Sequence, residues 1–233
     1  LIYFLDAVCQ YKKTDLKGKT VTVSGAGNVA LHAALKAVEK GAKVISLSNS
    51  RGLLHSESGL SDKNLRWAIE NHASSENILY DMAEQNMGAW VADKKPWHLK
   101  CDIALPCATQ NELQEEDANA LLNNGCKMVL EGANMPCTTD AQKQFFDAKI
   151  TYVPGKASNA GGVALSGLEM GQNAMFNQRD ASALDEQLCS IMNSIHERCV
   201  IEGKREDGYV DYMKGANIAA FRRLADAMLA QGV

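Results

Sequence analysis

The residues best suited to chemistry are two glycines, Gly25 and Gly27, with Ala30 three positions further on. They follow a β-branched run at 20–23 and form the pattern G-x-G-x-x-A where a helix is expected to start. Gly25 permits a tight turn, Gly27 lets the backbone approach a pyrophosphate, and Ala30 lets the helix pack closely on the strand. The helix start offers free N–H groups and a positive dipole end to phosphates. The dinucleotide-binding residues predicted here are Gly25, Gly27, Asn28 and Val29; a glycine turn without a ligand is the alternative.

The choice between NAD and NADP is expected at the end of the second strand. NAD enzymes place an acidic residue there, about 20 residues after the glycines, on the adenine ribose hydroxyls. This sequence has Ser48, Asn49, Ser50 and Arg51 instead. Asn49 and Ser50 can donate hydrogen bonds to a 2′-phosphate, and Arg51 can pair with it. The sequence therefore predicts NADP as the cofactor, unless Arg51 is only a solvated surface cation.

These residues need a parallel sheet covered by helices to position them, and the rest of the chain alternates in that way. Short apolar or β-branched runs predict strands, and apolar residues at helical spacing predict helices. The predicted fold is α/β, a Rossmann-type, doubly wound, mostly parallel sheet with additional C-terminal helices. Strands are predicted at 20–23, 43–47, 102–105, 128–130 and 150–153. Helices are predicted at 2–11, 29–39, 62–70, 77–85, 115–122, 139–147, 163–176, 183–202 and 216–230.

The overall composition argues against several classes of protein. The chain is 46% apolar and 22% charged with a net charge of −4, which favours neither nucleic acid nor an anionic membrane as a partner. No apolar run approaches the roughly 20 residues that cross a bilayer, and no signal peptide is recognised. The seven cysteines are scattered without a CxxC pair, and the five histidines match no metal spacing. We therefore expect a cytoplasmic protein with reduced thiols and no metal site.

Several longer segments resemble the glutamate dehydrogenase family, particularly its NADP-linked hexameric branch. Together with the glycine pattern they cover nearly the whole chain in the order found in the family. The segments are DIALPCATQNE at 102–112, EGANMP at 131–136, VPGKASNAGGVALS at 153–166 and the ending at 215–232.

The resemblance implies roles for individual residues. Those matching Thr109, Gln110, Asn134 and Asn159 approach the nicotinamide half of the cofactor in the family, although such residues also commonly cap turns and helices. The position of Ser166 meets the side-chain carboxylate of the substrate, and relatives acting on leucine, valine or phenylalanine generally carry an apolar residue there. Val163 and Ser166 are thus expected to bind substrate, with glutamate preferred. Ser166 as a plain helix residue is the alternative.

The resemblance also implies that this chain is not a whole enzyme. The family's substrate-binding and catalytic lysines and its proton-transfer aspartate belong to an N-terminal domain, so no catalytic residue is expected here. We expect one dinucleotide-binding domain at 1–233, made of a helix remnant (1–13), a Rossmann core (18–165) and a helical tail (166–233), with the N-terminal substrate domain absent.

The implied reaction is the reversible oxidative deamination of L-glutamate to 2-oxoglutarate and ammonia with hydride transfer to NADP. It would be carried out by a homohexamer, and the fragment alone is expected to be inactive. Two other functions stay open. One is a non-catalytic NADP(H)-binding regulatory module, and the other is the cofactor domain of a leucine- or phenylalanine-type amino-acid dehydrogenase.

Overall fold

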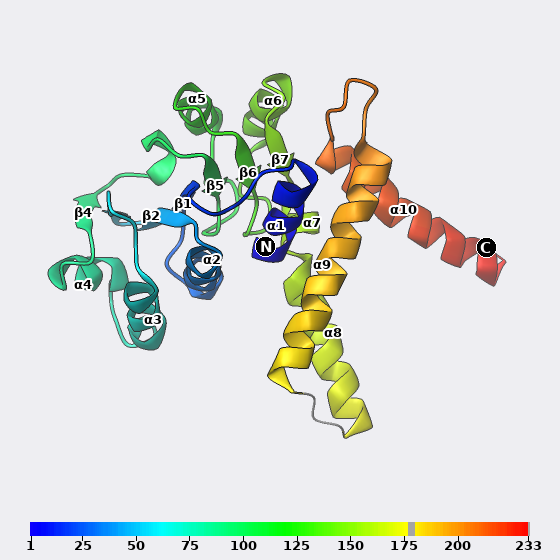
Figure 1. Ribbon diagram of the computed structural model, residues 1–233, viewed down its shortest axis with the longest axis horizontal. Coiled ribbons are helices and arrows are strands. Elements are labelled where there is room, and N and C mark those ends of the chain that lie inside the picture. The colour runs from blue at the N-terminus through cyan, green and yellow to red at the C-terminus, as the bar shows by residue number, and fades with distance from the viewer. Residues whose placement is uncertain (177–179, 233) are drawn as a thin grey trace.

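A mixed β-sheet forms the centre of the protein (Figure 1). The computed structural model describes residues 1–176 and 180–232. Within these residues the sheet has seven strands in the order β4-β3-β2-β1-β5-β6-β7. Their bounds are β1 (Thr20–Val23), β2 (Lys43–Asn49), β3 (Gly52–His55), β4 (Ala89–Ala92), β5 (Ile103–Leu105), β6 (Met128–Leu130) and β7 (Thr151–Val153). The predicted Rossmann-type fold is confirmed.

The five strands expected from the sequence are those that run parallel, in the order β2-β1-β5-β6-β7. In register, Val21 pairs with Val44 on one side and Ile103 on the other. The sequence analysis did not predict β3 and β4, which pair antiparallel at one edge. Neither carries a readable pattern, because β3 is a four-residue return from a turn and β4 is a mostly exposed edge strand.

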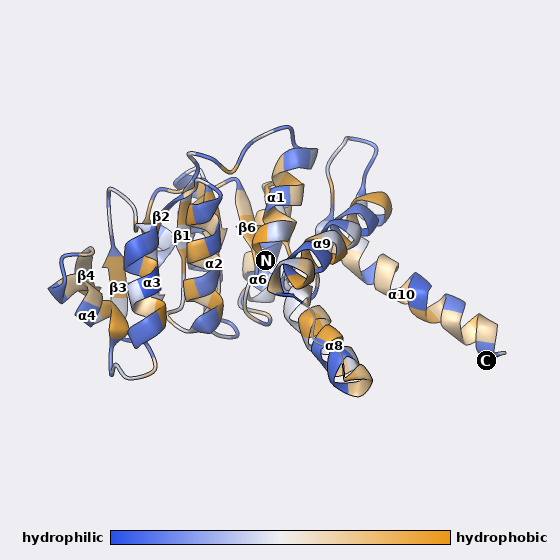
Figure 2. Ribbon diagram, turned by 60° about the horizontal axis from the view of Figure 1, so that its bottom comes forward, coloured by the Kyte–Doolittle hydropathy of each residue, from blue (hydrophilic) through white to orange (hydrophobic). Residues whose placement is uncertain are grey.

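Helices cover both faces of the sheet (Figure 2), and alternate residues of each strand join separate cores. One core joins Val21, Ile103 and Leu130 to helices α1–α4 and α9, and the other joins Ala104 and Val129 to η1, α5 and α6. The helix bounds are α1 (Ile2–Tyr11), α2 (Asn28–Glu39), α3 (Asp62–Asn71), α4 (Ile78–Glu84), η1 (Pro96–His98), α5 (Glu115–Asn123), α6 (Thr139–Asp147), α7 (Gly155–Ser158), α8 (Ala160–Met175), α9 (Ala181–Gly203) and α10 (Tyr212–Gln231).

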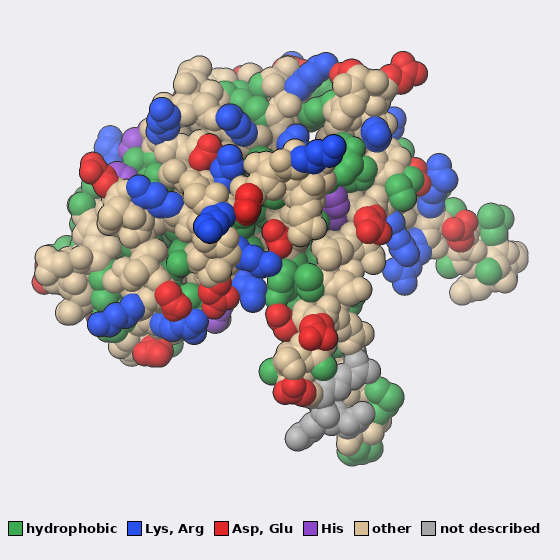
Figure 3. Space-filling model, viewed as in Figure 1, with side chains coloured by type: hydrophobic (Ala, Val, Ile, Leu, Met, Phe, Trp, Pro, Cys, Tyr) green, Lys and Arg blue, Asp and Glu red, His purple; other side chains and the backbone are tan. Residues whose placement is uncertain are grey.

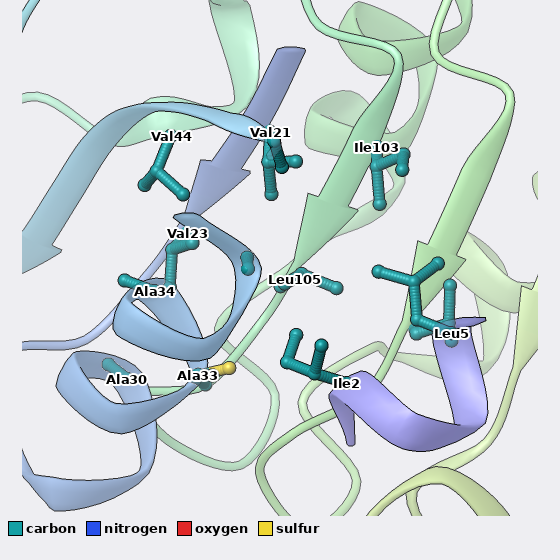
Figure 4. Close-up of a cluster of buried hydrophobic side chains, with 14 of the residues drawn as sticks. Ile2, Leu5, Val21, Val23, Ala30, Ala33, Ala34, Val44, Ile103 and Leu105 are labelled. Atoms are coloured by element: carbon teal, nitrogen blue, oxygen red, sulfur yellow. The ribbon is translucent and has the colours of Figure 1, made fainter. Parts of the chain in front are cut away.

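Helix α1 is an integral part of the larger core. Phe4, Leu5 and Val8 are fully buried, and Ile2 is nearly so. Figure 4 shows Ile2 and Leu5 directed from α1 toward the strand side chains around Leu105. No side chain caps the start of this helix. The first helix therefore holds the sheet and α9 together, because both pack against it.

Helices α8, α9 and α10 form an arm beside the sheet (Figure 1). Helix α10 begins at Tyr212, four residues before the predicted start, because the Asp211 side chain accepts a hydrogen bond from the Lys214 N–H (2.9 Å) and caps it. Where α9 and α10 cross, a Cβ added to Gly203 would overlap the Asp211 carbonyl, and one added to Gly215 would overlap the Cys199 carbonyl. The crossing therefore requires glycine at both positions.

Two global features bear on the sequence-based expectations. No helix in the described part of the chain is long and apolar enough to cross a membrane. All seven cysteines lie in that part and have free thiols, and six of them are buried.

We predict that Gly215→Ala lowers the free energy of unfolding by about 1–3 kcal/mol, because the new methyl group must separate two packed helices. Urea unfolding monitored by circular dichroism measures the change. Gly171→Ala is the control: Gly171 lies in α8 with no atom within 4 Å of an added Cβ, so alanine there should be neutral or slightly stabilising. Equal stability of the two variants would contradict the tight crossing.

His196 lies buried where α1, α9 and α10 meet, with its Nε2 3.0 Å from the Tyr212 hydroxyl. Burial lowers the pKa of His196 from 6.5 to about 4. Between these two pH values the unfolded chain binds a proton here that the folded chain does not. The contribution of neutral, buried His196 to stability is therefore fully present above about pH 6.5 and is lost as the pH falls toward 4.

We predict that protonation of His196 lowers the free energy of unfolding by at most about 3 kcal/mol as the pH falls from 6.5 to about 4. The measurement is the free energy of unfolding at a series of pH values between about 7 and 5, compared for the wild type and His196→Gln. The variant should show a shallower loss of stability on acidification. Identical slopes for both proteins would show that His196 does not carry the effect.

Candidate functional site

The carboxyl ends of the parallel strands form one edge of the sheet, and the sequence-predicted residues gather at this edge. The glycine turn follows β1, and the predicted NADP-selecting residues follow β2. The loops after β5, β6 and β7 carry the amide residues. In open α/β sheets, ligands bind in the crevice outside the carboxyl ends of the strands. The fold thus brings together residues that are far apart in the sequence.

The glycine turn has the geometry expected of a phosphate-binding turn. Gly25 has φ +96°, and an added Cβ would lie 2.9 Å from the Ala30 Cβ and 2.9 Å from the Cys107 carbonyl oxygen. Gly27 precedes α2 in an extended conformation, with no atom within 4 Å of an added Cβ. No side chain caps α2, and Asn28 and Val29 are exposed. The turn therefore leaves the helix N-terminus open for an anion.

Asn49 closes the turn after β2 with its side chain. Its side-chain oxygen accepts hydrogen bonds from the N–H groups of Arg51 (2.9 Å) and Gly52 (3.2 Å). Its amide nitrogen donates to the Asn77 side chain at the start of α4 (2.8 Å). Asn49 thus shapes the turn, while Ser50 and Arg51 are exposed. In the described part of the chain no carboxylate forms an ion pair with Arg51.

Glu112 organises the loop after β5. Its carboxylate accepts hydrogen bonds from the Ser24 hydroxyl (2.8 Å) and the Ala108 N–H (3.0 Å). The same hydroxyl accepts from the Cys107 N–H (2.9 Å), which joins the loops after β1 and β5. Burial raises the pKa of Glu112, and these hydrogen bonds oppose that shift. Thr109 and Gln110, the residues predicted to approach nicotinamide, are exposed on this loop.

The loops after β6 and β7 place Asn134 and Asn159 side by side. The Asn159 side-chain nitrogen donates to the Asn134 side-chain oxygen (2.9 Å) and lies 3.2 and 3.3 Å from the carbonyl oxygens of Gly132 and Ala133. An added Cβ on Gly132 would overlap the Cys107 sulfur, so this loop also packs against the loop after β5. The two asparagines are 25 residues apart in the sequence. They form one polar cluster at the same carboxyl edge of the sheet as the glycine turn.

The expected substrate residues lie on α8. Ser166 is exposed, and the Val163 side chain is 80% exposed. Figure 1 shows α8 running away from the end of β7, and Figure 3 shows a recess in the surface between the body of the protein and this arm. These two residues therefore face open space near the carboxyl edge, and in the described residues they are not part of an enclosed substrate pocket.

Other candidate sites do not coincide with this edge. In the described part of the chain no group of three or more His, Cys, Asp or Glu side chains could hold a metal ion. A hollow of about 520 Å³ lined by Lys43, Lys100 and Lys127 lies at the amino ends of the strands, opposite the glycine turn. It is therefore not the crevice in which this type of sheet binds nucleotides.

Comparison with known proteins agrees with this geometry. The family described as glutamate/leucine/phenylalanine/valine dehydrogenase matches residues 1–232. The chain belongs to this family. A Plasmodium falciparum glutamate dehydrogenase has a similar structure, with a TM-score of 0.95 at 37% identity over 100% of this chain and 50% of that one. Family membership, as inferred from the sequence segments, is confirmed.

The curated relatives include both NAD-specific and NADP-specific enzymes. The NAD-specific glutamate dehydrogenase of Bacteroides fragilis is 49% identical, and the NADP-specific enzyme of Escherichia coli is 47% identical. Each match covers 100% of this chain and 52% of the relative, so the chain spans about half the length of the curated relatives it matches. Similarity to the family therefore does not by itself decide between NAD and NADP.

Two acidic residues in the family's loops were not singled out from the sequence. Glu112 joins the loops after β1 and β5, and Glu131, which is 2% exposed, lies between the loops after β6 and β7. Glu112 is the last residue of the segment 102–112, and Glu131 is the first residue of the segment 131–136. Neither could be recognised from its neighbours in the sequence, because the Ser24 and Gly155 donors that mark them come from distant segments.

We predict that Gly25→Ala lowers the free energy of unfolding by about 2–4 kcal/mol, because alanine there combines a positive φ with overlap on two sides. Gly27→Ala should change stability by less than about 0.5 kcal/mol, because its Cβ would point into open space. Thermal and urea unfolding of the two variants give the comparison. A Gly25→Ala variant as stable as Gly27→Ala would refute the described turn.

Proposed function

We propose that this chain is the NADP(H)-binding domain of a glutamate dehydrogenase. The observation that carries the proposal is the open glycine turn at the start of α2, on the same edge as the loops that hold Asn134 and Asn159. A dinucleotide has a diphosphate in the middle and a nicotinamide at one end, and this edge offers groups suited to each. Family membership supports the same assignment.

The turn fits the diphosphate of a dinucleotide. Gly25 leaves no room for a side chain on the protein side, and Gly27 leaves open space on the other. The uncapped N–H groups of Asn28 and Val29 and the dipole of α2 would hold the phosphates. Ala30, buried against the turn, keeps the helix close to the strand.

NADP is proposed over NAD because no acidic residue ends β2. Arg51 is exposed with Ser50 on the turn, where a 2′-phosphate would pair with the guanidinium. Asn49 would act mainly by shaping the turn that presents the Arg51 backbone, since its side chain is already hydrogen-bonded. Both NAD-specific and NADP-specific relatives exist, which makes this part of the proposal the one to test first.

The nicotinamide half would lie against Thr109, Gln110, Asn134 and Asn159. Because the Asn159 side-chain nitrogen donates within the protein, its side-chain oxygen is the atom suited to accept a hydrogen bond from the carboxamide. Bound there, the nicotinamide would accept a hydride from the substrate. The role of this chain's own residues is to orient the ring and to exclude water on one side.

The proposed reaction is the reversible oxidative deamination of L-glutamate to 2-oxoglutarate and ammonia. Ser166 would meet the side-chain carboxylate, with Val163 beside it on α8, and the catalytic groups would come from a separate substrate domain. The proposed cofactor domain consists of a leading helix (1–13), a Rossmann core (18–165) and a helical tail (166–233). The chain alone would bind cofactor without turning over glutamate.

Seven free thiols in the described residues suit a reducing compartment, so we place the protein in the cytoplasm. A homohexamer of the full-length protein is proposed from the family resemblance.

The experiment is a fluorescence titration of the 233-residue chain with NADPH and with NADH. We predict saturable binding with NADPH favoured, and no glutamate-dependent reduction of NADP by the chain alone. Arg51→Ala should weaken NADPH binding about 10- to 100-fold and leave NADH nearly unchanged, as expected for loss of a charge-assisted pair.

Arg223→Ala removes a comparably exposed arginine from α10 and serves as the matched control, with no expected effect on either cofactor. Equal weakening of NADPH and NADH by Arg51→Ala would contradict the assignment of the 2′-phosphate. Turnover of glutamate by the chain alone would contradict the proposed division between two domains.

A further inference from the structure

Glu131 is a buried carboxylate without a cationic partner. It follows β6 and is 2% exposed, and in the described part of the chain no Lys, Arg or His forms an ion pair with it. Removing a carboxylate from water costs several kcal/mol unless hydrogen-bond donors replace the water. We therefore expect the Glu131 carboxylate to hold the surrounding loops in place through its hydrogen bonds.

Donors from three different segments surround its two oxygens. The Gly155 N–H donates to one oxygen (2.7 Å), and the Tyr152 hydroxyl donates to the other (2.6 Å). The Cys137 N–H lies 3.3 Å from that second oxygen. Two of these donors are backbone N–H groups, so the Glu131 side chain must act as an acceptor toward them. Burial raises the pKa of Tyr152 and keeps its hydroxyl protonated as a donor.

The backbone of Glu131 strengthens the same junction. Its carbonyl accepts from the Ser158 hydroxyl (2.5 Å), and its N–H donates to the Val153 carbonyl (3.1 Å). Glu131 therefore fastens the loop after β6 to the short helix α7 that follows β7. An added Cβ on Gly155 would lie 2.7 Å from the Ala133 carbonyl, so the two loops approach as closely as backbones can.

This junction leads directly to the proposed nicotinamide contacts. The Asn159 N–H donates to the Gly155 carbonyl (2.8 Å), and the Asn159 side chain donates to Asn134 (2.9 Å). The chain of contacts runs from Glu131 through Gly155 to both asparagines. Within residues 1–176 and 180–232, no hydrogen bond joins Glu131 to the glycine turn or to the turn at Arg51.

We propose that Glu131 is a positioning residue for the nicotinamide half of the cofactor: its carboxylate holds the loops of Asn134 and Asn159 in register with each other. The inference rests on the proposed function, because it assigns the two asparagines to nicotinamide. Weakening this clamp disturbs the nicotinamide end of the site and leaves the adenosine end intact. A purely structural role would disturb both ends alike.

The experiment compares two ligands, NADPH and 2′-phospho-ADP-ribose, which has the adenosine half and the diphosphate but no nicotinamide. Affinities for the 233-residue chain are measured by isothermal titration calorimetry. Glu131→Gln keeps the size of the side chain but has one acceptor oxygen in place of two, so one of the donors loses its partner. We expect NADPH affinity to fall about tenfold and the affinity of the nicotinamide-free ligand to change less than about twofold.

Tyr152→Phe is the second variant, and it decides the matter if Glu131→Gln folds poorly. It removes one donor while leaving the carboxylate and the Gly155 contact, so a loss of about threefold for NADPH alone is expected. Asp102→Asn is the matched control, because Asp102 also accepts a backbone N–H, from Thr20 (2.9 Å), but at the amino edge of the sheet. It should leave the ratio of the two affinities unchanged.

Amide hydrogen exchange gives a readout that needs no ligand. Glu131→Gln should speed exchange in residues 154–159 and leave residues 24–31 unchanged, because only the first segment donates to the carboxylate. Equal loss of affinity for both ligands, or unchanged NADPH affinity with unchanged exchange, would overturn the positioning role. A wild-type chain that binds neither ligand would instead overturn the proposed function, whatever the exchange data show about Glu131.

Discussion

Gly25 lies so close to the Ala30 side chain and the Cys107 carbonyl that no other residue fits between them. This contact joins the end of β1, the first turn of α2 and the loop after β5. This contact therefore sets the distance between α2 and the sheet. It also places the uncapped N-terminus of α2 at the carboxyl edge. The other parts of the site, from Arg51 to Asn159, are useful to a dinucleotide only if that helix start lies where it does.

Two carboxylates, buried Glu131 and half-buried Glu112, organise the loops at this edge. Glu112 and Glu131 both lack an ion-pair partner in the described residues, and both are satisfied by backbone N–H and hydroxyl donors. Such an arrangement fixes loop backbones from inside the protein. It leaves neutral side chains such as those of Thr109 and Gln110 exposed on the outer surface of the loop after β5.

The arm formed by α8 to α10 is held by a different means. Its helices cross at Gly203 and Gly215 through close backbone contact, while large apolar side chains on the same helices remain exposed. Those more than half exposed in this way include Val163, Met170, Phe221, Leu224 and Leu229. The arm is held by the α9–α10 crossing and by the packing of α9 on α1 and α8 and of α10 on β7, and Ser166 is exposed on α8.

The sequence by itself determined the local features, because they depend on neighbouring residues: the glycine turn, the parallel strands with their following helices, and the absence of an acid at the end of β2. Strands β3 and β4 escaped prediction because their pairing, not their composition, makes them strands. Only the tertiary structure decided that Asn49 is occupied within its own turn and that Asn134 meets Asn159. Likewise Glu131 and Glu112 became recognisable only through donors 24 and 88 residues away, since burial and hydrogen bonding depend on which segments the fold brings together.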